Sequence, residues 1–326
     1  MRRRVLGLVL LGLGGLCLGA ALAIRLFLAP ALVSLPLDQE ASAEVSDDGA
    51  TYLDLGELAE VQGPITARLT VQGDPTADEA SGDVAVWNSG TAITDEDGDL
   101  VIAPTEVVNC LDRETAEAVA CDARSIDGEP ADIEGLTLTF PFDTQQRDYD
   151  LWNNSAGAAY PARYDGEDEV AGVAVYRFLQ SIPETVVDEV EVPGRLAGES
   201  TDGTVTAEVV YRSERELLVE PVSGKIVSSV ETPVTVLRGP SGDTGATILS
   251  AELGPSAESL RTAAEGAAET RDQITLVQRT LPLAVAGLGL VLLVVGTLLY
   301  LRSRRGAHRA DGAPPVPQPA SVVTTP

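Results

Sequence analysis

Two long apolar stretches lie near the ends of the chain, and the region between them mixes apolar with polar residues. Val5–Ile24 contains no charged residue over 20 positions, and Thr280–Leu301 contains none over 22. At about 1.5 Å per residue, each stretch is long enough to cross a hydrocarbon core of about 30 Å as a helix. The pattern therefore predicts transmembrane helices over residues 5–24 and 280–301.

Arginines beside these stretches predict how the helices cross the membrane. Residues 2–4 are all arginine, and Arg302, Arg304, Arg305 and Arg309 follow the second stretch. Because basic residues stay preferentially on the cytoplasmic side, we expect residues 1–4 and 302–326 to be cytoplasmic. The protein would then lie in the cytoplasmic membrane, with residues 25–279 as one extracytoplasmic domain.

The first stretch also has features of a cleaved secretory signal. A basic start, an apolar run and Ala21-Leu22-Ala23 fit that alternative. The chain stays apolar past Arg25, through Leu26-Phe27-Leu28, whereas a cleaved signal is usually followed by polar residues. We therefore favour a retained helix, and both interpretations place most of the protein outside the cytoplasm.

Alternating apolar and polar residues within 25–279 predict strands with one buried face. The clearest runs are Ile65–Val71, Leu136–Phe140 and Thr204–Tyr211. Pairs that can supply the positive φ of tight turns lie between or beside such runs, at Asp97-Gly98, Asp127-Gly128, Asp165-Gly166, Asp202-Gly203 and Ser223-Gly224. Many short strands with such turns indicate a β-rich domain, built as an antiparallel curved sheet or a barrel.

Two segments depart from the strand pattern. Ser256–Gln278 is rich in Ala, Glu, Arg and Leu at helical spacing, which predicts a membrane-proximal helix leading into the second transmembrane helix. Residues 302–326 contain five prolines and few apolar residues, so we expect a disordered tail.

Charge is concentrated in the middle of the chain. The whole sequence has 22 basic and 50 acidic residues, a net charge of −28. The region 25–279 holds 15 of the basic and 49 of the acidic residues, a net charge of −34. Such a surface repels phosphate backbones, so nucleic acid is not an expected partner. About 255 residues suffice for a hydrophobic core, so this region is more than a linker.

The residues available for catalysis are few. His308 is the only histidine and lies outside 25–279, and Lys225 is the only lysine. The extracytoplasmic region therefore lacks the residues of a Ser-His-Asp site or a typical zinc site. Acidic runs at 95–99 and 165–169 do not match the spacing of a calcium-binding EF-hand, and solvated turns are the simpler interpretation. We expect no metal, no cofactor and no enzymatic activity.

Cys110 and Cys121 flank a polar, turn-like stretch at 111–117. They would face each other across a hairpin there, and an oxidising exterior would join them as a disulfide. Such a bridge contributes on the order of 2 to 3 kcal/mol. The alternative is two free thiols in separate strands.

Several short segments form a distinctive combination: the opening Met1-Arg2-Arg3-Arg4-Val5-Leu6-Gly7, Ala29-Pro30 with Pro36-Leu37-Asp38, Tyr160-Pro161-Ala162-Arg163-Tyr164, Val175-Tyr176-Arg177-Phe178 with Ile182-Pro183, and Val219-Glu220-Pro221-Val222-Ser223-Gly224. Together they resemble the actinobacterial porin PorA family of double-spanning envelope proteins. The resemblance implies an actinobacterial cell envelope, a β-rich extracytoplasmic domain and, in part of the family, a link to maturation of mannose-containing lipoglycans. It implies no catalytic residues.

The porin label of that family conflicts with the composition. A transmembrane barrel needs a lipid-facing apolar band bounded by aromatic girdles. Here four Phe, two Trp and seven Tyr are scattered along the chain, and two apolar helices already account for membrane attachment. We therefore regard a pore as the least favoured function, together with a glycan hydrolase built on paired carboxylates.

A non-catalytic binding module fits the sequence best. We expect the β-rich domain to bind or present a lipid or lipoglycan precursor in an apolar interior, during envelope synthesis. The candidate ligand-binding residues are aromatic side chains concentrated in one stretch: Trp152, Tyr160, Tyr164, Tyr176 and Phe178. Ordinary core packing is the competing interpretation for each. The alternative function is a scaffold for cell-envelope biosynthesis proteins, without a ligand cavity.

Overall fold

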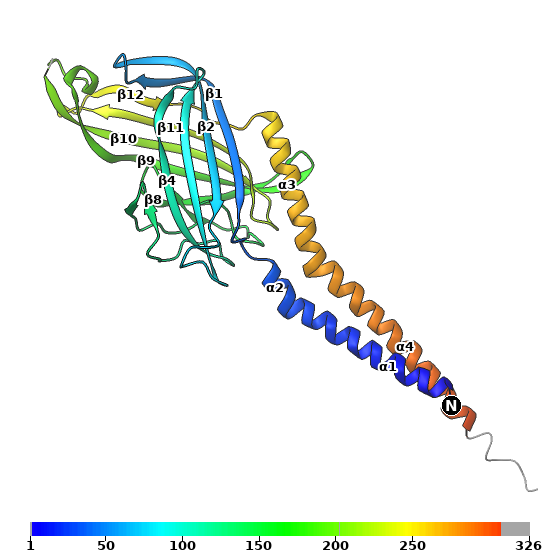
Figure 1. The fold of residues 1–326 in the computed structure, drawn as a ribbon. Coiled ribbons are helices and arrows are strands. Elements are labelled where there is room, and N and C mark those ends of the chain that lie inside the picture. Colours follow the sequence, from blue (N-terminus) through cyan, green and yellow to red (C-terminus); the bar gives the residue numbers. More distant parts are fainter. Residues whose placement is uncertain (1, 202, 308–326) are drawn as a thin grey trace, which may run out of the picture. The chain divides into compact units, whose positions relative to one another are not determined.

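A computed structural model describes residues 2–201 and 203–307, and it divides the chain into two units. One is helical and contains the described residues 2–32 and 275–307. The other, Val33–Ile274, is built on a single sheet (Figure 1). The two apolar helical segments and the large antiparallel sheet confirm the predicted fold class.

The sheet contains twelve strands, and every neighbouring pair is antiparallel. The strands are β1 (Glu40–Asp54), β2 (Ala59–Gly73), β3 (Val84–Asp95), β4 (Leu100–Asp112), β5 (Ser125–Ile126), β6 (Glu129–Pro130), β7 (Tyr149–Asn153), β8 (Ala158–Val170), β9 (Val173–Pro193), β10 (Thr204–Val219), β11 (Ile226–Arg238) and β12 (Thr244–Ser250). Their order across the sheet is β6-β5-β4-β3-β2-β1-β12-β11-β10-β9-β8-β7. The first and last halves of the domain therefore meet where β1 pairs with β12.

The sheet is curved but does not close, so the barrel alternative is wrong. Its edges are β6 and β7, and the chain between them forms no regular strand. Leu136 in that connection makes single bridges to Glu117 on one side and Leu151 on the other. The predicted strand Leu136–Phe140 is therefore also wrong, because its backbone bonds to several elements in turn instead of pairing along one.

The predicted turns are mostly confirmed. Gly98, Gly128 and Gly224 have φ of 85°, 82° and 71° in loops that connect neighbouring strands. Asp165-Gly166 is an exception, because it lies inside β8, where the register with β9 shifts. The β8–β9 turn is instead made by Ala171-Gly172. Asp202, of the pair Asp202-Gly203, lies outside the described residues.

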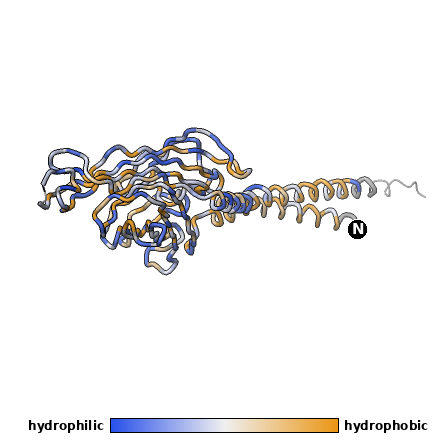
Figure 2. The backbone as a smooth tube through the Cα atoms, turned by 90° about the horizontal axis from the view of Figure 1, so that it is seen from above, coloured by the Kyte–Doolittle hydropathy of each residue, from blue (hydrophilic) through white to orange (hydrophobic). Residues whose placement is uncertain are grey.

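Alternation along the strands produces the core. Figure 2 shows polar and apolar positions interleaved along the strands. The main cluster contains Trp87, Leu111, Phe140, Leu151 and Phe178, with other side chains from both halves of the sheet domain. Burying these side chains removes apolar surface from water and is the main stabilising contribution to the fold.

Helix α3 (Ala257–Thr275) is amphipathic and packs its alanine face on the sheet. Ala264 and Ala267 are buried against Val170, Val175 and Val227. The small alanine side chains allow the helix backbone to approach the strands closely. The predicted helix at 256–278 is confirmed, since α3 continues through a π-helical segment η3 (Leu276–Thr280) into α4 (Leu281–Ala307).

Cys110 and Cys121 form a disulfide, as predicted, with their Cα atoms 6.3 Å apart. The chain between them turns back, because the amide of Asp112 donates to the carbonyl of Glu117 and that of Val119 donates to the carbonyl of Cys110. The bridge closes this loop next to the main core, since Leu111 and Ala116 belong to that cluster.

Among the described residues, two helical segments are long and apolar enough to cross a membrane. The first comprises α1 (Arg2–Ala23), a π-helical segment η1 (Ile24–Leu28) and α2 (Ala29–Leu32), so the helix runs eight residues past the predicted 5–24. The second contains α4, which extends six residues past Leu301. Residues 302–307 are therefore helical rather than disordered, and residues 308–326 lie outside the described residues.

Glycines set the contact between α1 and α4. A Cβ added at Gly14 would lie 2.8 Å from the carbonyl oxygen of Gly289, and one added at Gly7 would lie 3.1 Å from that of Gly296. Larger side chains would push the helices apart, as at small-residue contacts in membrane helix pairs. The two contacts are seven residues apart on each helix. The residue number rises on α1 as it falls on α4, so the two helices form an antiparallel hairpin.

This hairpin predicts a specific cross-link. A Cβ placed on Gly289 would lie 3.0 Å from the Cβ of Cys17, so a small shift gives the separation of about 3.5–4.5 Å found in disulfides. We expect Gly289→Cys to bond to Cys17 within one chain on mild oxidation, seen by mass spectrometry of the digested monomer. Gly287→Cys should not, because a Cβ there meets nothing within 4 Å. Equal cross-linking of both variants would contradict the helix contact.

Candidate functional site

The structure brings together three of the five aromatic residues that the sequence indicated. Tyr164 on β8 is directly opposite Phe178 on β9, with ring centroids 5.8 Å apart. Tyr176, two residues before Phe178 on the same strand, contacts Tyr164 at 5.6 Å. Phe178 is fully buried, whereas the two tyrosines are partly exposed.

Two further rings complete this group, and the sequence reasoning missed them. Phe140 lies 4.7 Å from Phe178 and 5.4 Å from Tyr149, measured between ring centroids. We call Phe140, Tyr149, Tyr164, Tyr176 and Phe178 the aromatic cluster. Phe140 has no exposed surface and Tyr149 is buried. The rings pack on one another, so this part of the interior is filled by side chains.

The other two predicted residues lie elsewhere. Trp152 is buried in a separate cluster with Val107 and Ile133, and its Nε1 has no hydrogen-bond partner among the described residues. Tyr160 is partly buried opposite Leu151, and its carbonyl accepts a hydrogen bond from Gln180. Neither belongs to the aromatic cluster.

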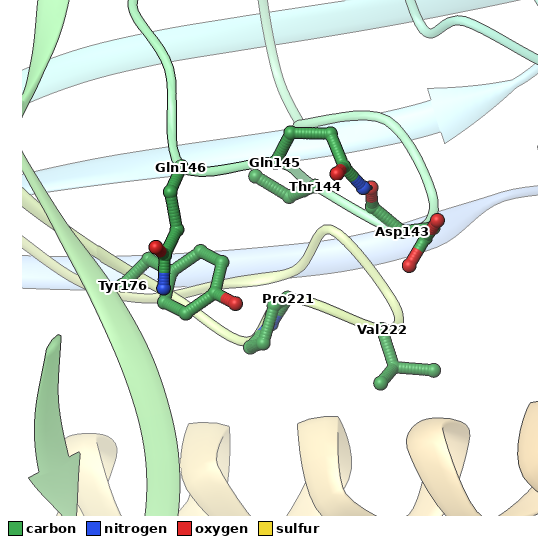
Figure 3. A pocket seen from close by; sticks show the side chains of 7 residues that line it. All are labelled: Asp143, Thr144, Gln145, Gln146, Tyr176, Pro221 and Val222. Carbon is green, nitrogen blue, oxygen red and sulfur yellow. Dashed lines mark hydrogen bonds between the residues drawn. The ribbon is translucent and has the colours of Figure 1, made fainter.

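An open pocket of about 430 Å³ lies beside the aromatic cluster (Figure 3). We call it the Tyr176 pocket, and its lining comes from a loop, from β9 and from the β10–β11 turn: Asp143, Thr144, Gln145, Gln146, Tyr176, Pro221 and Val222. Figure 3 shows the Tyr176 ring between the side chain of Gln146 and Pro221. The pocket thus combines one aromatic ring with amide, carboxylate and hydroxyl groups.

Backbone hydrogen bonds hold the two loops that form the pocket walls. The amide of Thr144 donates to the carbonyl of Pro221 at 2.7 Å, and that of Asp143 donates to Val222 at 3.2 Å. Nearby, the amide of Phe140 donates to the carbonyl of Gly224 at 2.9 Å. The pocket therefore has a fixed frame on a packed core.

Glu220 organises the β10–β11 turn from inside. Its side chain is only 1% exposed. The carboxylate accepts hydrogen bonds from the Val222 amide at 3.2 Å, the Ser223 amide at 2.8 Å and the Ser223 hydroxyl at 2.7 Å. These bonds replace the hydrogen bonds to water that the carboxylate loses when it is buried. Glu220 thus positions Pro221 and Val222 in the pocket wall.

Two carboxylates lie at or beside the pocket. Gln146 donates from Nε2 to Glu167 at 2.6 Å, and Asp143 is exposed on the pocket wall. Desolvation, with added repulsion from the Glu167 charge, raises the pKa of Tyr164 above its usual value. A neutral ligand that accepts and donates hydrogen bonds therefore suits the pocket better than an anion.

A second polar cluster joins buried and partly buried side chains of the sheet. The hydroxyl of Tyr211 donates to Glu231 at 3.0 Å and accepts from Asn153 at 3.2 Å, while Ser213 also donates to Glu231. Arg215 lies 3.5 Å from the same carboxylate. Burial, with the Glu231 charge, raises the pKa of Tyr211 to about 12, so its hydroxyl stays protonated at neutral pH. Each of these groups has a partner, and the cluster serves the packing of the sheet.

The fold defines a class of protein in which two apolar, membrane-compatible helices flank a domain built on one open antiparallel sheet. The chain belongs to the family described as Porin PorA, whose sequence profile matches residues 6–298. This match confirms the resemblance seen in the sequence and covers the whole sheet domain and most of both apolar helices. No curated protein matches the chain.

Proposed function

We propose that this protein is a non-catalytic, membrane-anchored cell-envelope protein whose sheet domain binds the glycan part of a lipoglycan precursor in the Tyr176 pocket. The observation that carries the proposal is a partly exposed tyrosine ring that lines an open pocket together with amide, carboxylate and hydroxyl side chains. Sugar rings stack their C–H faces on aromatic rings, and their hydroxyls bond to amides and carboxylates. A volume of about 430 Å³ lies within the usual range of ligand sites.

The packing of the aromatic cluster favours a glycan over an acyl chain in this domain. Phe140 and Phe178 have no exposed surface, so the space around them is taken by protein side chains. The proposed ligand therefore binds beside the cluster, and the cluster supports the Tyr176 ring from behind. Among the predicted aromatic residues, Tyr176 is the direct contact, and Tyr164 and Phe178 position it.

Topology and partners complete the proposal. Arginines at both ends of the chain support a cytoplasmic membrane location with cytoplasmic termini and an outer sheet domain. The protein would then present its ligand to cell-envelope biosynthesis proteins. The absence of histidine from residues 25–279 supports a binding role over an enzymatic one.

A scaffold without a ligand remains the second candidate, and the filled aromatic cluster favours it. A scaffold would bind envelope proteins through its surface and leave the Tyr176 pocket empty. In vivo cross-linking would then capture the same partner proteins from wild type and from a Tyr176→Ala variant. The glycan-binding proposal instead predicts that a variant of Tyr176 loses the ligand.

Tyr176→Ala is expected to weaken glycan binding by about fivefold or more, if stacking of a sugar ring on the tyrosine is comparable to the roughly 1–3 kcal/mol of a stacked nucleobase. The probe is soluble α-mannotriose added to the full-length protein in detergent, with binding followed by saturation-transfer NMR. Tyr160→Ala is the matched control, since Tyr160 is a partly buried tyrosine outside the pocket. Equal binding by wild type and Tyr176→Ala, or none by wild type, would refute the glycan site.

A further inference from the structure

A second pocket, of about 430 Å³, lies entirely within the helical unit. Its walls are mostly apolar and include Leu18, Leu22, Leu283 and Ala286. Two arginines, Arg25 and Arg279, also line it. We call this site the arginine groove, and it is distinct from the Tyr176 pocket of the sheet domain.

The hairpin register brings the two arginines to one level. The glycine contacts pair Gly7 with Gly296 and Gly14 with Gly289, so the paired residue numbers add to 303. The same register places Arg25 opposite residue 278, next to Arg279, and η1 contacts η3. Arg25 follows 20 uncharged residues and Arg279 precedes 22. Both guanidinium groups therefore lie at the same polar boundary of the apolar segment, where lipid headgroups begin.

Neither arginine has a partner among the described residues. Several arginines of the sheet domain pair with carboxylates, as Arg238 does with Glu184 at 2.6 Å and Glu208 at 2.9 Å. Arg25 and Arg279 make no hydrogen bond or ion pair in the described part of the chain, and residues 1–32 and 275–307 contain no Asp or Glu. The helical unit thus carries two unpaired positive charges beside an apolar groove.

The local helix geometry is also unusual at this level. Arg25 lies in η1 and Arg279 in η3, and both segments are π-helical turns within longer helices. Such turns are rare and are found frequently at functional sites, because they redirect side chains away from the regular helix positions. The two π-helical turns lie opposite each other on the two helices, at the polar boundary that contains both arginines.

We propose that the arginine groove binds one anionic phospholipid from the membrane leaflet on the side of the sheet domain. The phosphate would accept hydrogen bonds from the two guanidinium groups, whose donors match phosphate geometry. One acyl chain would lie along the apolar wall between Leu18 and Ala286. This site is independent of the proposed glycan binding, since α-mannotriose carries neither a phosphate nor an acyl chain.

The test uses native mass spectrometry of the full-length protein, incubated in detergent with equal amounts of phosphatidylglycerol and phosphatidylcholine. Wild type is expected to retain one phosphatidylglycerol in preference to phosphatidylcholine. The double variant Arg25→Gln with Arg279→Gln should retain at least about tenfold less phosphatidylglycerol. Arg302→Gln is the charge-matched control at the other end of α4, and it should bind like wild type.

A second pair of variants tests the apolar wall without changing charge. Ala286→Phe fills the groove and should also reduce phosphatidylglycerol retention, whereas Ala284→Phe changes an exposed residue that does not line the groove. Equal retention of the two lipids by wild type would mean that the arginines contact bulk headgroups only, and would overturn the proposal. Wild-type retention by the double arginine variant, or by Ala286→Phe, would overturn it as well.

Discussion

Phe178→Ala is expected to lower the free energy of unfolding by about 3–5 kcal/mol, the range for removing a buried phenylalanine. Phe178 has no exposed surface and contacts the rings of Phe140, Tyr149 and Tyr164 at 4.7, 5.9 and 5.8 Å between centroids. The substitution would leave a cavity in the middle of the aromatic cluster. Urea unfolding of the full-length protein in detergent, followed by tryptophan fluorescence, measures the change.

Leu179→Ala is the matched control for this prediction. Leu179 is the next residue on β9, points to the other face of the sheet and is 41% exposed. Its removal should cost about 1 kcal/mol or less, as is usual for surface substitutions. A similar small effect for Phe178→Ala would contradict a packed cluster and would return an acyl-chain cavity to consideration.

Strand periodicity explains why much of the sheet could be predicted. Ile65, Ala67 and Val71 on β2 are buried, while Arg68 and Thr70 between them are exposed. One face of each strand meets the core and the other meets solvent, so alternation in the sequence follows directly from the pleat. The same reasoning identified β10 and the turns at Gly98, Gly128 and Gly224.

The segment at 136–140 shows where that reasoning fails. Leu136 and Phe140 are buried, so the residues alternate as in a strand. The backbone partners are far away in the sequence, however, since Leu136 donates to Asp150 and Phe140 donates to Gly224. Alternation reports which side chains are buried, but it does not reveal whether a neighbouring strand pairs along the whole segment.

The aromatic residues illustrate the same limit for the site. Tyr176 and Phe178 are two residues apart on one strand, so the sequence alone places them on one face. Phe140 joins them only because the connection between β6 and β7 folds back onto the core, and Tyr149 joins them from β7, which pairs with β8. No local pattern indicates that fold, and the Tyr176 pocket depends on it.

The spacing of glycines in the two apolar segments is a sequence feature that predicts the helical hairpin. Gly7 and Gly14 are seven residues apart, as are Gly289 and Gly296, which is two helical turns. Matching spacings on two apolar segments are what an antiparallel pair with close backbone contact requires. The arginine groove follows from that register, because it sets Arg25 against the segment containing Arg279.

Glu220→Ala is expected to lower the free energy of unfolding by about 3 kcal/mol, because removing the acceptor leaves buried donors unsatisfied, which costs roughly 1–3 kcal/mol. The variant would leave the Val222 and Ser223 amides and the Ser223 hydroxyl without their acceptor. Ser223 is buried, so water cannot easily replace the carboxylate. Thermal unfolding of the full-length protein, followed by circular dichroism, measures the loss.

Glu189→Ala is the control, since Glu189 lies exposed on β9 and its side chain has no hydrogen bond in the described structure. Glu220→Gln should fall between the two, because it keeps one acceptor oxygen but brings an amide group toward the turn. The turn also supplies Pro221 and Val222 to the pocket wall, so folded Glu220→Ala should bind α-mannotriose more weakly than Glu189→Ala. If Glu220→Ala unfolded at the same temperature as Glu189→Ala, the buried carboxylate would not be holding the turn, and the pocket wall would need another support.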